Sequence, residues 1–250
     1  MIIIKSPAEI QKISASCHIV AEILDYLKGY VKVGMTTADI EACVERLIKK
    51  RKAKPAFKGY RGYPASICTS VNNQVVHGIP SSKCVLKDGD ILSIDLGVIK
   101  DGFYGDAAIT IPIGNISKEA KELIRATEES LYKGIKEAVV GNRVSDISSA
   151  IQEYIESRGF SVVRAFVGHG IGRMLHEEPQ VPNFGKPGQG HRLKEGMTLA
   201  IEPMVNAGQP DIKILEDGWT AVTSDGSLSA HFEHTVVITK NGPEILTKLY

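Results

Sequence analysis

An internal repeat is the feature that most constrains the fold. Residues 86–95, LKDGDILSID, recur as residues 193–202, LKEGMTLAIE. Chance resemblance between strands flanked by turns is the alternative, and it would explain one such match better than several in the same order. The other matches pair 33–40 with 140–147, 77–79 with 169–171, and 106–111 with 233–238. The repeat predicts two related halves, about 1–112 and 113–250.

Each half is predicted to form two helices followed by strands. Capping residues and apolar residues at helical spacing predict helices over about 7–28, 37–52, 118–138 and 145–157. Alternating β-branched segments predict strands near 66–71, 74–77, 90–99, 103–111, 162–168, 197–206, 219–224 and 230–239. Helices followed by strands indicate an α+β fold in which the helices cover one face of a curved antiparallel sheet. Because no Gly/Ser-rich linker separates the halves, we expect a single domain over residues 1–250.

Composition excludes several classes of protein. The chain has 30 basic and 29 acidic residues, which leaves no overall basic surface for nucleic acid or an anionic membrane. The sequence shows neither a signal peptide nor a run of about 20 apolar residues. The four cysteines are far apart and form no CxxC pair, so they are interpreted as free thiols. We therefore expect a cytoplasmic protein, and the absence of coiled-coil heptads favours a monomer.

Carboxylates interrupt segments that otherwise have the pattern of apolar strands. Burial of an unpaired charge is energetically costly, so carboxylates at these positions are expected to have a compensating partner. The repeat relates them in pairs, because Asp95 corresponds to Glu202 and Asp106 to Glu233. A two-fold relation between the halves would bring all four together. Converging carboxylates require protons or cations, and two divalent ions would balance four negative charges.

The expected hairpin register places the two carboxylates of the first half, Asp95 and Asp106, on one face of the sheet. Asp101-Gly102 fits a two-residue loop, which pairs Gly97 with Asp106. Asp95 lies two residues from Gly97 and so shares its face. The two carboxylates are then diagonal neighbours, with Cβ atoms about 7–8 Å apart or less. We expect Gly97 to leave room for an ion between them.

Histidines and an aromatic loop complete the candidate site. His169 would add a nitrogen to the carboxylates, a donor set that suits Mn²⁺, Fe²⁺, Co²⁺ or Zn²⁺. Two such ions about 3.5–4 Å apart activate water and polarise a carbonyl, which predicts a hydrolase. His77 and His176 are weaker candidates by themselves. The loop FKGYRGYP, residues 57–64, predicts a binding pocket, although its tyrosines are equally compatible with core positions. The remaining histidines are interpreted as structural: His18, His191, His231 and His234.

These residues stand in motifs that resemble the type I methionine aminopeptidases in their short bacterial form. The motifs are HGIP (77–80), DLG (95–97), GD (105–106), GHGIG (168–172), HEEP (176–179), IEP (201–203) and FEHT (232–235). The resemblance covers essentially the whole chain. It implies the pita-bread fold with two pseudo-symmetric halves, and removal of the initiator methionine from nascent polypeptides whose second residue is small.

The resemblance also implies roles for individual residues. Asp95, Asp106 and Glu233 would bind one divalent ion, and Asp106, His169, Glu202 and Glu233 would bind a second. The ions could be Co, Mn, Fe, Zn or Ni. His77 and His176 would flank the substrate amide, and Glu202 is our candidate for the general base. The residues implied to line the methionine pocket are Tyr60, Tyr63, Cys68 and Trp219.

Two pocket positions depart from the family pattern. Phe57 and Leu175 stand where many bacterial relatives carry a cysteine and a phenylalanine, but both are apolar and should accept a thioether. A monovalent cation known in some relatives would lie near Asn72, Gln74 and Ser229. Nascent polypeptide N-termini would be the substrate, which is compatible with transient ribosome contact. The chain begins close to the first helix, so we expect no N-terminal extension of the eukaryotic kind, and the interval between HEEP and IEP leaves no space for the type II insertion.

Two alternatives remain at this point. An X-Pro dipeptidase or aminopeptidase of the same fold would share much of the ligand set, but such relatives usually carry an extra N-terminal domain. A metal-free binding module on the same fold would be expected to lack ligands, whereas all five are present in the sequence.

Overall fold

Capping residues fix where the helices begin. In the computed structural model, which describes residues 1–249, the Ser6 hydroxyl accepts from the Glu9 N–H while the Glu9 carboxylate accepts from the Ser6 N–H. Thr36 and Asp39 form the same reciprocal pair before the second helix. Such pairs satisfy amide groups that have no partner within the helix. The helices are α1 (Pro7–Tyr30), α2 (Thr37–Lys50), α3 (Lys118–Lys136) and α4 (Val144–Glu156), with a short 3₁₀ turn, η1 (Tyr60–Gly62).

The strands form one large curved sheet and two small ones. The large sheet has the order β1-β4-β5-β14-β9-β7-β8, with β15 paired to β14 and β2 to β4. Two three-stranded sheets have the orders β13-β10-β6 and β11-β12-β3. The strands are β1 (Lys54–Pro55), β2 (Cys68–Val71), β3 (Gln74–Val76), β4 (Ile91–Lys100), β5 (Phe103–Pro112), β6 (Ser161–Val162), β7 (Gly168–Gly170), β8 (Glu177–Val181), β9 (Thr198–Ile201), β10 (Met204–Asn206), β11 (Ile212–Ile214), β12 (Ala221–Thr223), β13 (Ser229–His231), β14 (Glu233–Thr239) and β15 (Gly242–Ile245).

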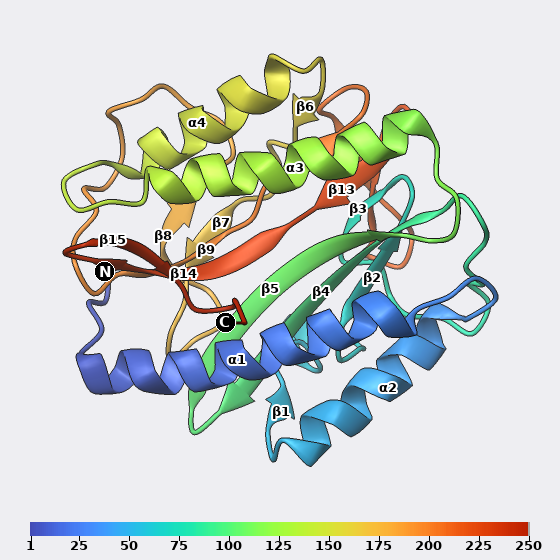
Figure 1. Cartoon of the computed structure of the whole chain (residues 1–250), viewed down its shortest axis with the longest axis horizontal. Helices are drawn as coiled ribbons and strands as arrows, with labels where there is room; N and C mark the ends of the chain where they lie inside the picture. The colour runs from blue at the N-terminus through green and yellow to red at the C-terminus, as the bar shows by residue number, and fades with distance from the viewer. Residues whose placement is uncertain (250) are drawn as a thin grey trace.

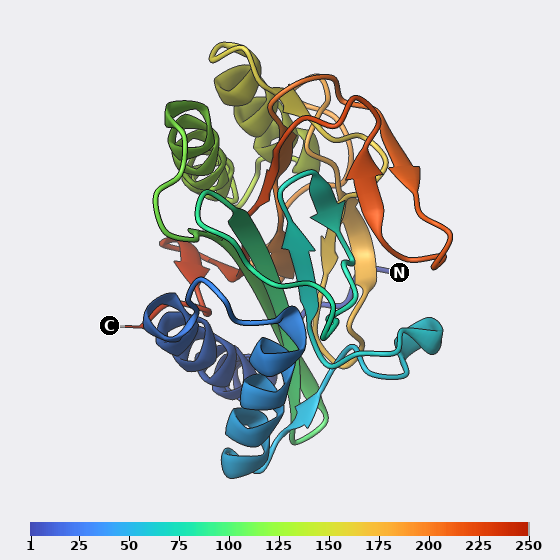
Figure 2. The ribbon, with the colours of Figure 1, turned by 90° about the vertical axis from the view of Figure 1, so that its right-hand side faces the viewer.

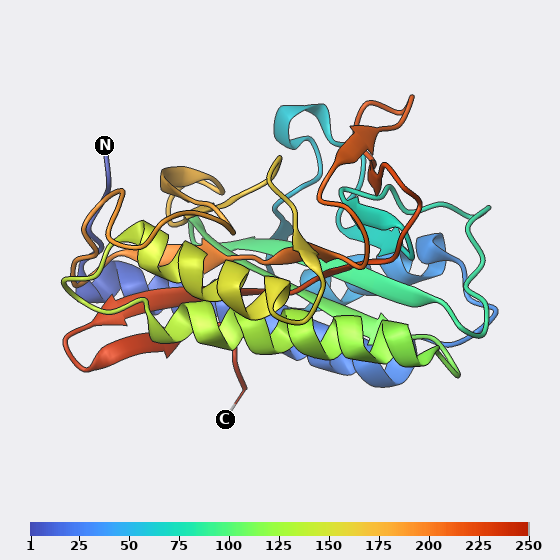
Figure 3. The ribbon, with the colours of Figure 1, turned by 90° about the horizontal axis from the view of Figure 1, so that it is seen from above.

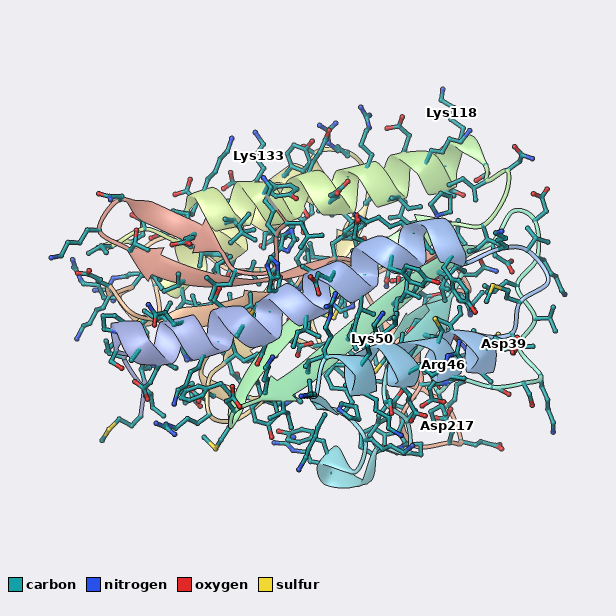
Figure 4. The ribbon with its side chains drawn as sticks, turned by 60° about the horizontal axis from the view of Figure 1, so that its bottom comes forward. Asp39, Arg46, Lys50, Lys118, Lys133 and Asp217 are labelled. Atoms are coloured by element: carbon teal, nitrogen blue, oxygen red, sulfur yellow. The ribbon has the colours of Figure 1, made fainter. Side chains whose placement is uncertain are left out.

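The molecule has a helical side and a loop side. All four helices lie on one face of the large sheet, as Figure 1 shows, and two apolar clusters between helices and strands form most of the core. Charged side chains such as Lys118 and Lys133 on α3 point away from the sheet (Figure 4). The η1 turn and the β11–β12 hairpin stand over the opposite face (Figures 2 and 3). The α+β prediction is confirmed, and none of the described helices has a stretch both long and apolar enough to cross a bilayer.

Equivalent hydrogen bonds recur in the two halves. The Gly34 N–H donates to the Leu86 carbonyl at 2.8 Å, and the Gly141 N–H donates to the Leu193 carbonyl at 3.1 Å. The isolated bridge between Thr36 and Val85 likewise has a counterpart, at residues 143 and 192. The sequence repeat therefore corresponds to repeated local structure. Tyr250, the last residue of the expected second half, lies outside the described residues.

Three predicted strands are wrong as continuous elements. The segments 162–168, 197–206 and 230–239 each divide into two strands that belong to different sheets. In the second segment the break contains Pro203, which has no N–H for a strand ladder. Glu202 therefore follows the end of β9 and Glu233 begins β14, so both carboxylates lie where the chain changes sheets.

Candidate metal centre and its pocket

The sheet order brings all five predicted ligands together. Asp95 lies on β4, Asp106 on β5, Glu233 at the start of β14, Glu202 just beyond β9, and His169 on β7. These five strands are consecutive neighbours in the large sheet. The gathering of ligands from both halves agrees with the prediction that the repeat brings the carboxylates together.

The strand register puts the carboxylates on a common face. Asp95 pairs with Ala108, which pairs on its other side with Glu233. Gly97 pairs with Asp106, so the predicted hairpin register is confirmed. Because side chains alternate along a strand, Asp106 shares the face of Ala108, two residues away. The carboxylates thus line one patch of the sheet.

The space above Gly97 has a different use from the one expected. A Cβ atom at this position would lie 2.6 Å from Cε1 of Phe57 and 2.8 Å from Cβ of Ala56. The missing side chain therefore makes room for the Phe57 ring, and not for an ion as the sequence suggested. The aromatic ring packs directly beside the acidic patch.

The ligand atoms approach closely. One donor atom each from Asp106, His169 and Glu233 lie within 4.8 Å of one another. His169 Nε2 lies 3.5 Å from Oε1 of Glu202. His169 Nδ1 donates to the Gly170 carbonyl at 2.9 Å, so Nε2 is the ring nitrogen left to face the carboxylates.

Burial and crowding shift the pKa values of these groups strongly. Burial raises the pKa of Asp95 to about 7. Burial first, and neighbouring carboxylates second, raise the pKa values of Asp106, Glu202 and Glu233 well above their usual range. Burial lowers the pKa of His169 to about 4, so its imidazole is neutral at pH 7, the form that binds metal. Without cations, the cluster must hold protons.

The cluster fits divalent metal ions. Asp95 Oδ1, Asp106 Oδ1 and Glu233 Oε1 are buried and have no hydrogen-bond partner. Buried polar atoms are normally hydrogen-bonded, so three orphaned oxygens at one place require a ligand. Several carboxylates with one imidazole form a donor set for Mn²⁺, Fe²⁺, Co²⁺ or Zn²⁺. This gathering argues against the metal-free alternative.

Two further predicted histidines border the cluster. The His176 ring packs edge-on against His169 at 4.3 Å between centroids, and its Nδ1 lies 2.7 Å from the Tyr60 hydroxyl. Burial lowers the pKa of His176 to about 3. His77 has a positive φ of 61° and packs edge-on against Phe166. An αL conformation at a non-glycine residue is strained and is common at functional positions.

A cavity of about 310 Å³ adjoins the cluster and is lined by the predicted pocket residues. Tyr63 packs edge-on against Trp219, with 5.2 Å between the ring centroids, and its hydroxyl lies 3.1 Å from the backbone carbonyl oxygens of Ile67 and Gly78. Leu175 belongs to the buried apolar wall. The predicted residues that line the cavity, besides the five ligands, are Phe57, Tyr60, Tyr63, Cys68, His77, Leu175, His176 and Trp219.

Some residues at the site were not predicted. His231 was interpreted as structural, yet its Nε2 lies 3.8 Å from Oε2 of Glu202 and has no hydrogen-bond partner. Its position two residues before Glu233 was the available signal. Phe166 lies in the segment 162–168, which the sequence predicted to be a strand, whereas the structure makes the residues between β6 and β7 a loop that borders the cavity. Arg61 also borders the cavity and belongs to the predicted pocket loop 57–64, although it was not singled out; the other unpredicted lining residues are Val76, Ala165, Val167 and Met204.

Comparison with known proteins agrees with this geometry. Residues 11–240 match the model of metallopeptidase family M24. The chain is 58% identical to the methionine aminopeptidase of Clostridium perfringens over 247 residues, which cover 99% of each chain. The chain belongs to the methionine aminopeptidases of metallopeptidase family M24. A crystal structure of the methionine aminopeptidase from Thermotoga maritima superimposes on this M24 peptidase with a TM-score of 0.98 at 52% identity, covering 100% of both chains.

Membership confirms the type I methionine aminopeptidase resemblance and the pita-bread fold. The prolidase of Pyrococcus furiosus shares the fold with a TM-score of 0.79, but at 26% identity, and the match covers 99% of this M24 peptidase and only 66% of the prolidase. The alternative of an X-Pro dipeptidase is therefore the weaker one. The enzyme is a metal-dependent peptidase, and the buried Asp, Glu and His cluster is its candidate metal site.

Proposed function

We propose that this methionine aminopeptidase removes the initiator methionine from nascent polypeptides whose second residue is small. The observation that carries the proposal is the convergence of five ligands beside an apolar cavity. An acidic patch suits the positively charged free amino terminus, which would restrict cleavage to the first residue. A preformed apolar pocket suits an unbranched thioether side chain.

We propose that the cluster holds two divalent ions. Asp95, Asp106 and Glu233 would hold one, and Asp106, His169, Glu202 and Glu233 would hold the other. Bound ions of this kind, drawn from Co, Mn, Fe, Zn and Ni, activate water and polarise the scissile carbonyl. Asp106 and Glu233 would serve both ions. Their place on adjacent strands, β5 and β14, supports this shared role.

The chain's own residues would handle the proton and the substrate amide. Glu202, at the edge of the cluster, would accept the proton of the attacking water and pass it to the leaving amine. If the Tyr60 hydroxyl donates to Nδ1 of His176, the ring proton sits on Nε2, which can then donate to the substrate carbonyl oxygen. His77 would contact the amide nitrogen of the leaving residue, and its strained backbone supports this role.

Specificity for methionine would come from the cavity wall. Burial of a thioether against apolar and aromatic side chains is favourable, and sulfur makes good contacts with ring edges. The wall is formed by Phe57, Tyr60, Tyr63, Cys68, Leu175 and Trp219.

Further expectations accompany this function. We propose that the chain is a single catalytic domain, works as a monomer in the cytoplasm, and meets its substrate as it emerges from the ribosome. A monovalent cation would bind near Asn72, Gln74 and Ser229, where the Ser229 N–H donates to the Asn72 carbonyl. The polar side chains of these three residues hydrogen-bond to the protein, so backbone carbonyls would be the cation ligands.

One assay tests the proposal. Protein reconstituted with Mn²⁺ or Co²⁺ is incubated with Met-Ala-Ser and Ala-Pro peptides, with and without a chelator. We expect release of methionine alone, abolished by the chelator and by Asp106→Asn. Cleavage of Ala-Pro would support the dipeptidase alternative, and no turnover with any divalent metal would contradict both.

A further inference from the structure

A buried ion pair ties the N-terminal arm, residues 3–6, to the active-site side of the sheet. Lys5 Nζ lies 2.5 Å from Oε2 of Glu177, and the two side chains are only 3% and 1% exposed. Among the Lys and Arg ion pairs of residues 1–249, it is the only one with both side chains buried. The Lys5 N–H also donates to the Gly196 carbonyl at 2.9 Å, which fixes the arm.

The Glu177 carboxylate organises the loop between β7 and β8, residues 171–176. Its Oε1 accepts from the Arg173 N–H at 2.8 Å and from the Met174 N–H at 3.2 Å. The loop wraps the ion pair so closely that a Cβ atom on Gly172 would lie 2.5 Å from Cε of Lys5 and 2.8 Å from Oε1 of Glu177. The shape of this loop therefore depends on where the carboxylate is held.

The same loop supplies two residues of the site. Leu175 is buried in the pocket wall, and His176 reaches the edge of the metal cluster. His176 directly precedes Glu177, which begins β8. Because the two residues are joined by one peptide bond, a displacement of Glu177 would also displace His176 and its ring.

We propose that Lys5 is a positioning residue for His176 and acts through Glu177. The inference rests on the proposed role of His176 in methionine release. Removal of the ammonium group leaves an uncompensated buried carboxylate, which is strongly unfavourable. The carboxylate then shifts toward water, its bonds to the Arg173 and Met174 amides weaken, and the His176 ring leaves its place beside the substrate carbonyl.

The test is Lys5→Met, which keeps a long apolar side chain and removes only the charge. Steady-state kinetics with Mn²⁺ and Met-Ala-Ser are measured well below the unfolding temperature. We expect kcat to fall roughly 10- to 100-fold, the scale of a misplaced catalytic group, while KM changes by less than about threefold. A general loss of stability would instead lower Tm and leave kcat per folded molecule unchanged.

A second measurement needs neither metal nor turnover. Amide hydrogen exchange of the metal-free protein reports local opening of the loop. In Lys5→Met we expect the Arg173 and Met174 amides to exchange at least about tenfold faster, while amides of the β4–β5 hairpin keep their rates. This readout also separates the inference from the proposed function, because it holds or fails even if the enzyme released no methionine.

The matched control is Glu9→Gln, which weakens the other ion pair of this loop, between Glu9 and Arg173. That pair is solvent-exposed, so kcat should stay within about twofold. If Lys5→Met does not fold, the double variant Lys5→Met/Glu177→Gln provides the test, because it leaves no unpaired charge buried. We expect kcat to fall about threefold or more and the two amides to exchange faster, since a neutral, unanchored amide accepts more weakly. Wild-type kcat and exchange in a folded variant would overturn the proposal.

Discussion

Removal of metal should make the stability of this enzyme fall as pH rises through neutrality. The four carboxylates of the centre have raised pKa values in the folded chain, about 7 for Asp95 and well above the usual range for Asp106, Glu202 and Glu233. In the unfolded chain, carboxyl groups titrate near pH 4. At pH 7 the metal-free folded protein therefore holds protons that the unfolded chain has released.

The sign follows from proton linkage. A group whose pKa is raised by folding stabilises the protein fully below its unfolded pKa, and this contribution is lost as pH rises through its folded pKa. For each proton that the folded state retains and the unfolded state has released, the free energy of unfolding falls by roughly 1–2 kcal/mol per unit rise in pH. The buried histidines act oppositely, but only below about pH 7, because His169, with a pKa of about 4 when folded, titrates near 6.5 when unfolded.

The assay is urea unfolding between pH 7 and 8, with excess chelator and with excess Mn²⁺. With one or two protons retained, the free energy of unfolding of the chelated protein should fall by about 1–4 kcal/mol across this interval. Bound Mn²⁺ requires ionised ligands in the folded state, so the slope due to the cluster should vanish. The gap between the two conditions should widen as pH rises.

Two variants locate the effect. Asp106→Asn removes a central carboxylate, lowers the repulsion on its neighbours, and should reduce the slope of the chelated protein. Glu195→Gln, at an exposed surface position, should leave the slope unchanged. A chelated wild-type protein whose stability is flat or rises between pH 7 and 8 would refute the idea that the cluster retains protons without metal.

Three further predictions concern the pocket. Gly97→Ala places a methyl group 2.6 Å from Phe57, so the ring must move; we expect a stability loss of about 1–3 kcal/mol and a higher KM for methionyl peptides, measured by urea unfolding and peptide kinetics. Tyr60→Phe removes the hydroxyl that meets His176, and kcat should fall roughly tenfold with KM nearly constant; an unchanged kcat would contradict this tautomer argument. Leu175→Ala should cost about 2–5 kcal/mol of unfolding free energy and broaden acceptance to bulkier first residues, tested with leucyl and phenylalanyl peptides; unchanged selectivity would show that Leu175 does not shape the pocket.

Local signals and the internal repeat in the sequence predicted much of the fold and the candidate ligands. Helix starts were predicted because caps such as Ser6 with Glu9 act within one turn. The β4–β5 register followed from Asp101-Gly102, because a two-residue loop leaves only one pairing. The repeat related Asp95 to Glu202, and the cost of a buried charge led from that relation to the prediction of a metal site. The loop 57–64 was predicted as a pocket from its residues, whereas the other pocket residues and the catalytic roles came from the family resemblance.

What the sequence determined by itself is local: which segments are helical or extended, where tight turns lie, and which carboxylates interrupt apolar strands. Only the tertiary structure decided which strands become neighbours, that the chain changes sheets at Glu202 and Glu233, that Phe57 fills the space above Gly97, and that Lys5 reaches Glu177. The physical reason is range. Capping and turn formation depend on residues a few positions apart. Close packing and the pairing of buried charges join residues far apart along the chain, and no periodic sequence pattern indicates such contacts.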